Sequence, residues 1–452
     1  MDEHTTASGA TLLLMQGAAS DRKQASKPAP RPSLVYVTPL MPRPTGNGLA
    51  MRAAAILQAL AQRFEVHLFV VPVSGDAGPP CDFVRQHTAR YVVLDLAQTL
   101  DPLFALISSI RDPEERARAA LAYPKPFLSR DCTGESGRRL VEWSNPIRPH
   151  AIHVMRLYLA PVIDPFLRGR QQDRPFHVLD LDDDEVVSYE RLAALYVAAG
   201  NPDAARYTRA EARKFHAFAT RYLPAFDRVE VCSEHDARSL TNRFPGARFV
   251  VLPNSIAPRP RLPRPASRDA VRLLFIGTLG YLPNGDAAWF LCREVLPALR
   301  RLTGRSIVID LAGAGDASAL QDLARDPAIT LHGYVDDLAP LYAAADMAVV
   351  PLRAGGGTRI KLLEAFAYGV PVVATTLAAE GIAVTHNEHL LLADDAESFA
   401  RACLETALRP DLAAARADRA AQLVAAQHSP ARLRTSVAEL YQAADFIHEF
   451  PA

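Results

Sequence analysis

Short runs of apolar residues alternate along the chain with longer segments in which apolar residues recur every three or four positions. Residues 34–37 form the first run, residues 50–63 an amphipathic segment, and residues 66–71 a second run. Two strands that are apolar on both faces, joined by a helix, indicate a parallel sheet with helices on both sides. The same pattern predicts further strands at residues 91–94, 151–154, 178–181, 229–232, 249–252, 273–276, 307–311, 329–331, 347–350, 370–374 and 390–392.

Amphipathic segments predict the helices that connect these strands. The Ala- and Arg-rich stretch 188–222 predicts a long helical segment, and shorter helices are predicted at residues 286–302 and 361–368. Residues 430–450 predict one more amphipathic helix, because their apolar side chains lie three and four positions apart. The alternation of strands and helices therefore predicts an α/β protein.

The alternation is interrupted at one place, residues 257–270, where four prolines lie among arginines. Each proline disfavours helix at the preceding residue, so this segment is predicted to be a stiff linker. Two open sheets joined in this way enclose a cleft at the carboxyl ends of their strands, where ligands of such sheets bind. The predicted organisation is a disordered arm at 1–32, a Rossmann-like domain at 33–256, the linker at 257–270, a second Rossmann-like domain at 271–428, and a C-terminal helix at 429–452 that packs back toward the first domain.

Composition excludes several classes of protein. Apolar residues make up 49% and charged residues 22% of the chain, as in soluble globular proteins. The 50 basic residues balance the 50 acidic ones, which argues against a nucleic-acid partner. No apolar run reaches the roughly 18 residues that span a bilayer. The five cysteines are odd in number and lack C-x-x-C spacing, which argues against disulfides and zinc and predicts a cytoplasmic protein.

One segment, residues 349–382, combines a buried strand, three glycines and a helix that carries charge. Gly355, Gly356 and Gly357 allow a close approach of the backbone to a ligand, and free N–H groups at the start of the helix attract an anion. Arg359 and Lys361 add positive charge. The pattern predicts a phosphate site, and the alternative is a tight turn followed by two solvated basic side chains.

This segment resembles the nucleotide-sugar signature of the family-four retaining glycosyltransferases, in the branch with a G-G-G-T-R-x-K-x-L-E-A run. The similarity extends to residues 275–297, 332–335, 342–346 and 251–254, and covers about residues 34–445 in all. It implies the GT-B fold, in which two Rossmann-like domains with parallel sheets face each other across a cleft. It also implies a nucleotide diphosphate sugar as donor, retention at the anomeric carbon, no cofactor and no obligatory metal.

The resemblance assigns roles to individual residues. The catalytic set, which stabilises the leaving diphosphate, is Arg359, Lys361, and the backbone amides of Gly357 and Thr358. Glu364 is expected to bind the ribose, and the backbone of Gly333, Tyr334 and Val335 to read the base. The donor-binding set is Gly277, Thr278, Asn284, Gly333, Tyr334, Val335, Gly355, Gly356 and Glu364.

On the first domain, we expect the acceptor and the cleft to be lined by Gly46, Asn47, Gly48, His153, Asp182 and Asp183. Alternatives exist for three of these residues. His153 ends a strand, and a histidine in that position is more often hydrogen-bonded within the core than in contact with a substrate. Asp180 and Asp182 have the D-x-D form of a divalent-metal site, whereas Asp182 or Asp183 at a strand end can instead cap a helix. We favour a cleft without metal.

The sequence departs from the family at two positions. The wider family carries two glutamates in an E-x7-E pattern, and Gly356 stands where the first is expected, eight positions before Glu364. In the family that carboxylate touches the donor sugar, which leaves Gly357 and Thr358 amides as sugar contacts here. The usual phosphate lysine after the strand that ends near Gly277 is also absent, so that Arg359 and Lys361 would neutralise the diphosphate.

These features together predict a hexosyltransferase of polysaccharide or glycoconjugate biosynthesis. Its partners would be a nucleotide sugar and an acceptor that is a glycan, a lipid-linked sugar or a small molecule. It would work in the cytoplasm, with peripheral contact to the inner face of the membrane. Two alternatives are a nucleotide-sugar epimerase of the same fold and a non-catalytic protein that binds sugar nucleotides.

Overall fold

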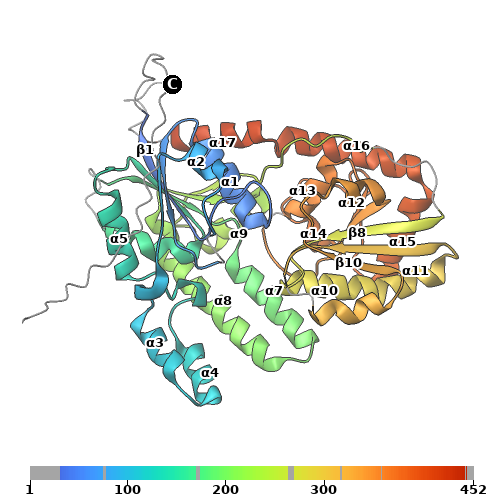
Figure 1. The fold of residues 1–452 in the computed structure, drawn as a ribbon, viewed down its shortest axis with the longest axis horizontal. Helices are drawn as coiled ribbons and strands as arrows, with labels where there is room; N and C mark the ends of the chain where they lie inside the picture. The colour runs from blue at the N-terminus through green and yellow to red at the C-terminus, as the bar shows by residue number, and fades with distance from the viewer. Residues whose placement is uncertain are drawn as a thin grey trace, which may run out of the picture.

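The computed structural model describes residues 31–74, 78–168, 174–262, 269–315, 318–357, 359–442 and 444. Within these residues two parallel sheets lie side by side, each flanked by helices, as predicted (Figure 1). The first has the order β3-β2-β1-β4-β5-β6-β7, with β1 (Ser33–Thr38), β2 (Glu65–Val70), β3 (Arg90–Val93), β4 (Ala151–Met155), β5 (Phe176–Asp180), β6 (Arg228–Val231) and β7 (Phe249–Val251). The second has the order β10-β9-β8-β11-β12-β13, with β8 (Ala270–Ile276), β9 (Ser306–Ala312), β10 (Ile329–Gly333), β11 (Met347–Val350), β12 (Val372–Ala374) and β13 (Leu391–Leu392).

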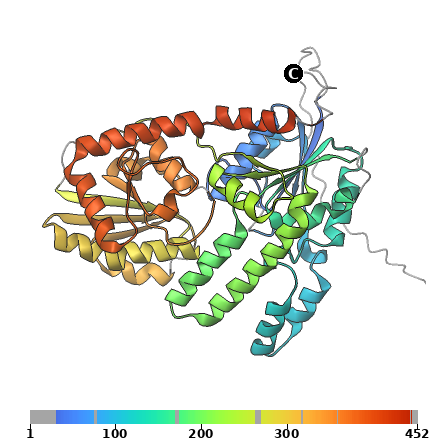
Figure 2. The same cartoon turned by 180° about the vertical axis from the view of Figure 1, so that it is seen from behind.

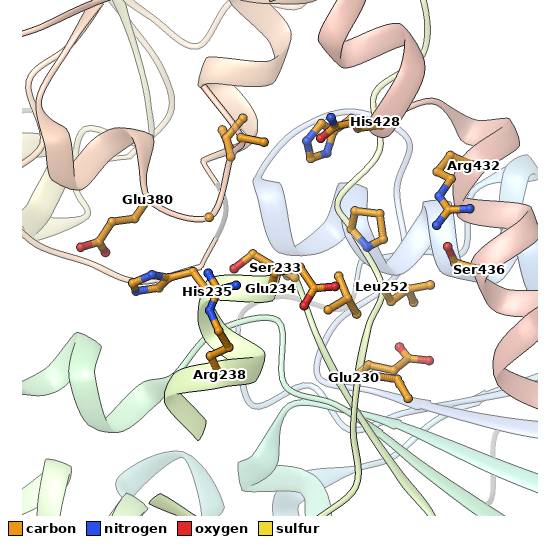
Figure 3. A pocket seen from close by; sticks show the side chains of 18 of the residues that line it. Glu230, Ser233, Glu234, His235, Arg238, Leu252, Glu380, His428, Arg432 and Ser436 are labelled. Atoms are coloured by element: carbon orange, nitrogen blue, oxygen red, sulfur yellow. The ribbon is translucent and has the colours of Figure 1, made fainter. Parts of the chain in front are cut away.

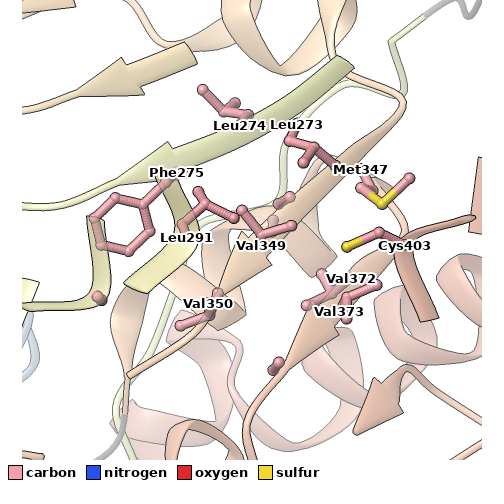
Figure 4. Packing of buried hydrophobic residues seen from close by; sticks show 14 of the residues in the cluster. Leu273, Leu274, Phe275, Leu291, Met347, Val349, Val350, Val372, Val373 and Cys403 are labelled. Atoms are coloured by element: carbon pink, nitrogen blue, oxygen red, sulfur yellow. The ribbon is translucent and has the colours of Figure 1, made fainter. Parts of the chain in front are cut away.

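The central strands β11 and β12 of the second sheet are apolar and buried on both faces. Figure 4 shows the centre of this core, where Leu273, Met347 and Val373 of three neighbouring strands pack together. Each of these side chains is fully buried. Complete burial of such a side chain contributes roughly 1.5–3 kcal/mol to the free energy of unfolding. The continuous apolar runs of the sequence thus correspond to strands inside two layers of helices.

The helical segment predicted at 188–222 is divided into two antiparallel helices, α7 (Glu185–Ala198) and α8 (Pro202–Tyr222). Gly200 between them has φ of +72°, a backbone conformation that glycine adopts without strain. The Asn201 side chain accepts a hydrogen bond from the Ala204 amide and so begins α8, with Pro202 in its first turn. These three residues end one helix and start the next. The Ala- and Arg-rich composition, which is similar in both helices, does not indicate this break.

The remaining helices surround the sheets, and a π-helical turn at Leu291–Val295 joins α10 to α11 over the predicted range 286–302. Two of them, α3 and α4, project from the edge of the first domain (Figure 1). None of the described helices is both long and apolar enough to cross a membrane. Their bounds are α1 (Gly48–Leu60), α2 (Asp82–His87), α3 (Pro102–Ser109), α4 (Pro113–Ala122), α5 (Gly134–Ser144), α6 (Asp164–Leu167), α9 (Glu234–Arg243), α10 (Leu282–Phe290), α11 (Leu296–Leu302), α12 (Ala339–Ala344), α13 (Ile360–Ala367), α14 (Thr376–Ala379), α15 (Ala396–Leu408), α16 (Pro410–Gln427) and α17 (Pro430–Gln442).

The chain passes between the two sheets twice. The first passage lies between β7 and β8, where residues 257–262 form neither helix nor strand and residues 263–268 fall outside the described ranges. The second is the junction of α16 and α17, and α17 packs on the first domain (Figure 2). There the Tyr441 ring lies 4.8 Å from the ring of Phe64, centroid to centroid. Of the arm predicted at 1–32, residues 1–30 lie outside the described residues, as do 443 and 445–452 of the C-terminal segment.

Candidate active site

The glycine loop, residues 353–357, connects β11 to α13 at the carboxyl edge of the second sheet. Gly355 has φ of +111° and Gly357 has φ of +67°, so both adopt left-handed backbone that other residues reach only with strain. Arg359 is the N-cap residue of α13. The expected anion site therefore has the predicted local structure, a glycine loop leading into a helix N-terminus, although Thr358 falls outside the described residues.

Arg359 is buried beside this loop, with 8% of its surface exposed. Its Nη1 donates to the carbonyl oxygen of Gly357, whereas Nε and Nη2 have no hydrogen-bond partner among the described residues. Burial lowers the pKa of this guanidinium, and the negative charge of Asp183 opposes that shift. A buried cation with unpaired N–H donors is costly unless an anion completes its hydrogen bonds.

Lys361 lies on another side of the loop. Its Nζ donates to Oδ1 of Asn284 at 2.5 Å and lies 4.8 Å from the centre of the Phe275 ring. A Cβ atom on Gly277 would be 2.7 Å from this Nζ, so the lysine reaches the loop that follows β8. Burial, and secondly the charge of Arg359, lower the pKa of Lys361 to about 7. Its charge near neutral pH therefore depends on whether an anion is close.

Glu364, one turn further along α13, faces the linker. Tyr342 donates its hydroxyl to Oε2 of Glu364 at 3.4 Å, and Nη2 of Arg259 lies 3.8 Å from Oε1. Burial raises the pKa of this carboxyl, and Arg259 opposes the shift. The carboxylate is thus fixed at the edge of the cleft, and its contact with a ribose stays a prediction.

The other residues expected to bind the donor lie in loops at the same edge of the sheet, because parallel strands end together. Asn284 joins two of these elements, since its Nδ2 donates to the Thr278 carbonyl oxygen at 3.0 Å while its Oδ1 accepts from Lys361. Gly333 has φ of +66° and accepts a hydrogen bond from the Gly313 amide at 2.8 Å. Tyr334, which follows, is 59% exposed. Gly277 therefore lies beside Lys361 and Asn284, and Gly333 is linked to the loop after β8 through Gly313. Contact of these residues, or of Tyr334 and Val335, with a donor stays a prediction.

The first domain contributes its own glycine-containing loop. Gly46 has φ of +111°, and Asn47 caps α1 by accepting a hydrogen bond from the Ala50 amide at 2.9 Å. A Cβ atom on Gly48 would lie 3.3 Å from Cδ1 of Ile360, the first residue of α13. The N-termini of α1 and α13 therefore meet across the cleft, with Asn47 occupied as a cap.

The D-x-D carboxylates are paired with arginines. Arg52, buried in α1, bonds Asp180 at 2.7 Å, and Arg156, at the end of β4, bonds Asp182 at 3.1 Å. Two guanidinium groups on these carboxylates supply the positive charge that a divalent cation would otherwise provide. The helix cap considered for Asp182 or Asp183 falls instead to Asp184, which accepts from the Val187 amide at the start of α7.

His153 lies in the core and not at the surface of the cleft. The side chain is fully buried, its Nδ1 lies 2.9 Å from the hydroxyl of Tyr441 on α17, and Nε2 lies 3.5 Å from Oε2 of Glu230. Burial lowers the pKa of His153 to about 4, which keeps the ring neutral. An acceptor cannot reach this ring, so we correct the expectation that His153 lines the acceptor site. The same residues, His153, Asp180 and Glu230, are close enough together for a metal, but Asp180 is already bound by Arg52.

A link across the cleft was not predicted. Nη1 of Arg191 on α7 donates to the carbonyl oxygen of Gly355 at 3.0 Å, and the same guanidinium binds both carboxylate oxygens of Glu380 at 2.7 and 2.9 Å. This Arg191–Glu380 bridge joins the first domain to the glycine loop. Nothing in the Ala- and Arg-rich stretch distinguishes Arg191 from its neighbours, so only the fold reveals it. Arg156 was missed as well, although an arginine two positions beyond the predicted strand 151–154 is a signal.

Beside the bridge, a cavity of about 940 Å³ opens between the two domains (Figure 3). Glu380, His235 and Arg238 line one part of it, and His428 and Arg432 another. Arg359, Lys361 and Glu364 do not line this cavity. Glu380 of the bridge therefore faces this cavity, whereas Arg191 contacts the glycine loop.

Comparisons with known proteins address the fold of the whole chain and the family of its second domain. Residues 270–408, most of the second domain, match the family model described as glycosyl transferases group 1. Sucrose-phosphate synthase from Thermosynechococcus elongatus has a similar structure, with a TM-score of 0.63, 16% identity, and coverage of 91% of this chain and 98% of that chain. HepE from Anabaena in complex with UDP and glucose is also similar, with a TM-score of 0.61, 14% identity, and coverage of 91% and 100%. A glycosyltransferase from Rickettsia africae is similar as well, with a TM-score of 0.61, 12% identity, and coverage of 91% of this chain and 98% of that chain. No curated protein sequence matches the chain. The fold is therefore GT-B, as the resemblance implied.

Proposed function

We propose that the protein is a glycosyltransferase that moves a hexose from a nucleotide diphosphate sugar to an acceptor hydroxyl, with retention, in polysaccharide or glycoconjugate biosynthesis. The match of residues 270–408 to the group 1 glycosyl transferases supports the reaction class. The similarity to HepE, which binds UDP and glucose, supports a nucleotide sugar as the donor. The five cysteines, all free, support a reducing compartment such as the cytoplasm.

The observation that carries this proposal is the buried guanidinium of Arg359 at the glycine loop, which is only partly hydrogen-bonded. Two of its nitrogens lack partners among the described residues, and the N-terminus of α13 lies beside them. A diphosphate would accept from these donors. During transfer, negative charge grows on the leaving diphosphate, and donors fixed in advance stabilise that charge without reorganising.

The other residues act around this centre. Lys361 would approach the diphosphate from the side of Gly277, and amides of Gly357 and Thr358 would add donors. Glu364 would accept ribose hydroxyl hydrogen bonds, and the backbone of Gly333, Tyr334 and Val335 would contact the base. The acceptor, a glycan, a lipid-linked sugar or a small molecule, would enter from the loop of Gly46 and Gly48.

Water competes with the acceptor for the activated sugar, so the cleft must close around the donor. The Arg191–Glu380 bridge supports such a closed arrangement, because it ties α7 to the glycine loop. The bridge is partly exposed, with about 30% of each side chain accessible, so opening it costs little free energy. The bridge can therefore form when the cleft closes around the donor and break again when the product leaves.

The test is calorimetric binding of UDP-glucose, ADP-glucose and GDP-mannose, each beside its nucleoside diphosphate, followed by assay of nucleoside diphosphate release with candidate acceptors. We expect one base to be preferred and release to require an acceptor. Epimer formation from the donor alone would favour the epimerase. If a nucleotide sugar binds but no nucleoside diphosphate is released from it under any condition, the protein is a non-catalytic binder. If none of the three nucleotide sugars binds, the proposed donor is wrong.

A further inference from the structure

Asp183, in the loop after β5, lies directly against the glycine loop of the facing domain. A Cβ atom built on Gly356 would be 1.9 Å from Oδ1 of Asp183 and 2.2 Å from Oγ of Ser188. No side chain fits at position 356 while these two groups stay in place. The carboxylate of the first domain thus occupies the space that a side chain at 356 would need.

The backbone at Gly356 does not itself require glycine. Gly355 and Gly357 have left-handed φ values, whereas Gly356 between them does not. Its lack of a side chain therefore has a different cause from that of its neighbours, namely the room taken by Asp183 and Ser188. Position 356 is also where the resemblance leads one to expect a carboxylate.

The Asp183 carboxylate is held in place and keeps capacity for further hydrogen bonds. The Ser188 hydroxyl lies 2.9 and 2.8 Å from the two carboxylate oxygens of Asp183 and donates to them. The backbone amide of Asp183 donates to the Leu181 carbonyl oxygen at 2.6 Å. One hydroxyl proton satisfies only part of a carboxylate, which accepts about four hydrogen bonds. Asp183 also acts electrostatically on Arg359 and on Tyr281, residues of the second domain at the same site.

We propose that Asp183 is the carboxylate that binds hydroxyl groups of the donor sugar, and that Gly356 is a glycine so that this carboxylate can reach the glycine loop from the opposite domain. The inference rests on the proposed function and assigns its sugar recognition. A carboxylate beside the diphosphate site is suited to sugar hydroxyls and unsuited to phosphate oxygens, which it repels. Since Asp183 belongs to the first domain, the sugar would be recognised only when the two domains are together.

The first test separates the sugar from the nucleotide. Asp183→Asn keeps the shape and the contact with Ser188 but removes the charge. We expect it to weaken the preferred nucleotide sugar of the panel about 10- to 100-fold, while the matching nucleoside diphosphate changes less than about twofold. Equal losses for both ligands, or tighter binding of the nucleotide sugar, would overturn the inference, the latter because Asp183 would then be a group that merely fills the site.

The second test uses the steric relation between the two positions. Gly356→Ala should displace Asp183 and reproduce the selective loss of sugar affinity. In a background that carries both Asp183→Ala and Ser188→Ala it should add less than about twofold, because both groups that the new Cβ atom would meet are gone. Gly304→Ala is the matched control, because a Cβ atom there meets nothing within 4 Å. If Gly356→Ala weakens sugar binding as much in that background as in the wild-type protein, Asp183 is not the group that Gly356 accommodates.

A rescue completes the design. Asp183→Gly combined with Gly356→Glu returns a carboxylate to the contact from the other domain, and we expect it to recover at least part of the lost sugar affinity. Thermal unfolding of every variant checks that the fold is retained. If the wild-type protein binds none of the three nucleotide sugars, the proposed function itself fails, whereas binding that is insensitive to Asp183 overturns only this inference.

Discussion

Two basic residues at the glycine loop are separated by a single position and yet differ in environment. Arg359 has unpaired donors and a single carbonyl contact, whereas Lys361 is bound to Asn284 beneath the loop after β8. Alternate positions at a helix start do not share a face, so the difference follows from the backbone. We therefore expect the two side chains to respond differently to substitution and to pH.

Arg359→Ala should lower kcat for nucleoside diphosphate release by about 100-fold or more, with a smaller change in donor affinity. Loss of one preorganised donor to a developing anion has an effect of that order. Contacts that strengthen in the transition state act on kcat more than on binding. Steady-state kinetics with calorimetric donor affinity measures both. An unchanged kcat with a raised KM would move the leaving-group role to another residue.

The lowered pKa of Lys361 predicts that donor affinity depends on pH. In the free protein its lowered pKa, about 7, leaves it largely neutral above that pH. A bound diphosphate favours the ammonium form, so binding takes up a proton and affinity should fall as the pH rises from 7 to 9, by at most tenfold per unit. Titrating the nucleotide sugar, whose diphosphate does not ionise in this range, in two buffers measures the uptake. Lys361→Arg should abolish the dependence, and a wild-type affinity that is flat over the same range would contradict it.

At the scale of elements, the sequence was most informative where local pattern and structure coincide. The continuous apolar runs marked the strands because both faces of each sheet are covered, and the three glycines before Arg359 marked a helix N-terminus. The α7–α8 turn was not predicted, because the Ala- and Arg-rich composition continues on both sides of Gly200 and only three local residues mark the turn. Contacts such as Asp183 with Gly356, or Arg191 with Gly355, join residues far apart in the chain, and no periodicity reports them.

The α7–α8 turn gives a prediction of stability. Gly200→Ala places a Cβ atom at φ of +72° in open space, so its cost is backbone strain alone, about 1–2 kcal/mol of the free energy of unfolding. Gly304→Ala, equally open but with ordinary φ, should change this free energy by less than about 0.5 kcal/mol. Denaturant unfolding of the two variants provides the comparison, and equal stabilities would mean that the turn relaxes.

At the scale of the whole molecule, the Arg191–Glu380 bridge connects the two domains. Exchanging the acidic and the basic residue of this ion pair tests whether the bridge holds the domains together. Arg191→Glu should repel Glu380 and lower kcat severalfold, because the closed arrangement becomes less populated. Adding Glu380→Arg restores the attraction and should recover part of the loss, though not the bond to the Gly355 carbonyl. Kinetics and small-angle scattering follow activity and closure together. A double variant no better than the single one would show that the bridge does not support closure.

Helix α17 has a consequence for how the chain is made. It completes the core on α1, where it packs against Phe64, but it is encoded after the whole of the second sheet. The second domain is thus, topologically, an insertion within the first. At roughly 5–20 residues per second, ribosomes need on the order of ten seconds or more between β7 and α17. During that interval the apolar face of α1 that α17 covers in the finished fold lacks this partner, so the first domain can complete its core only after the second domain has been synthesised.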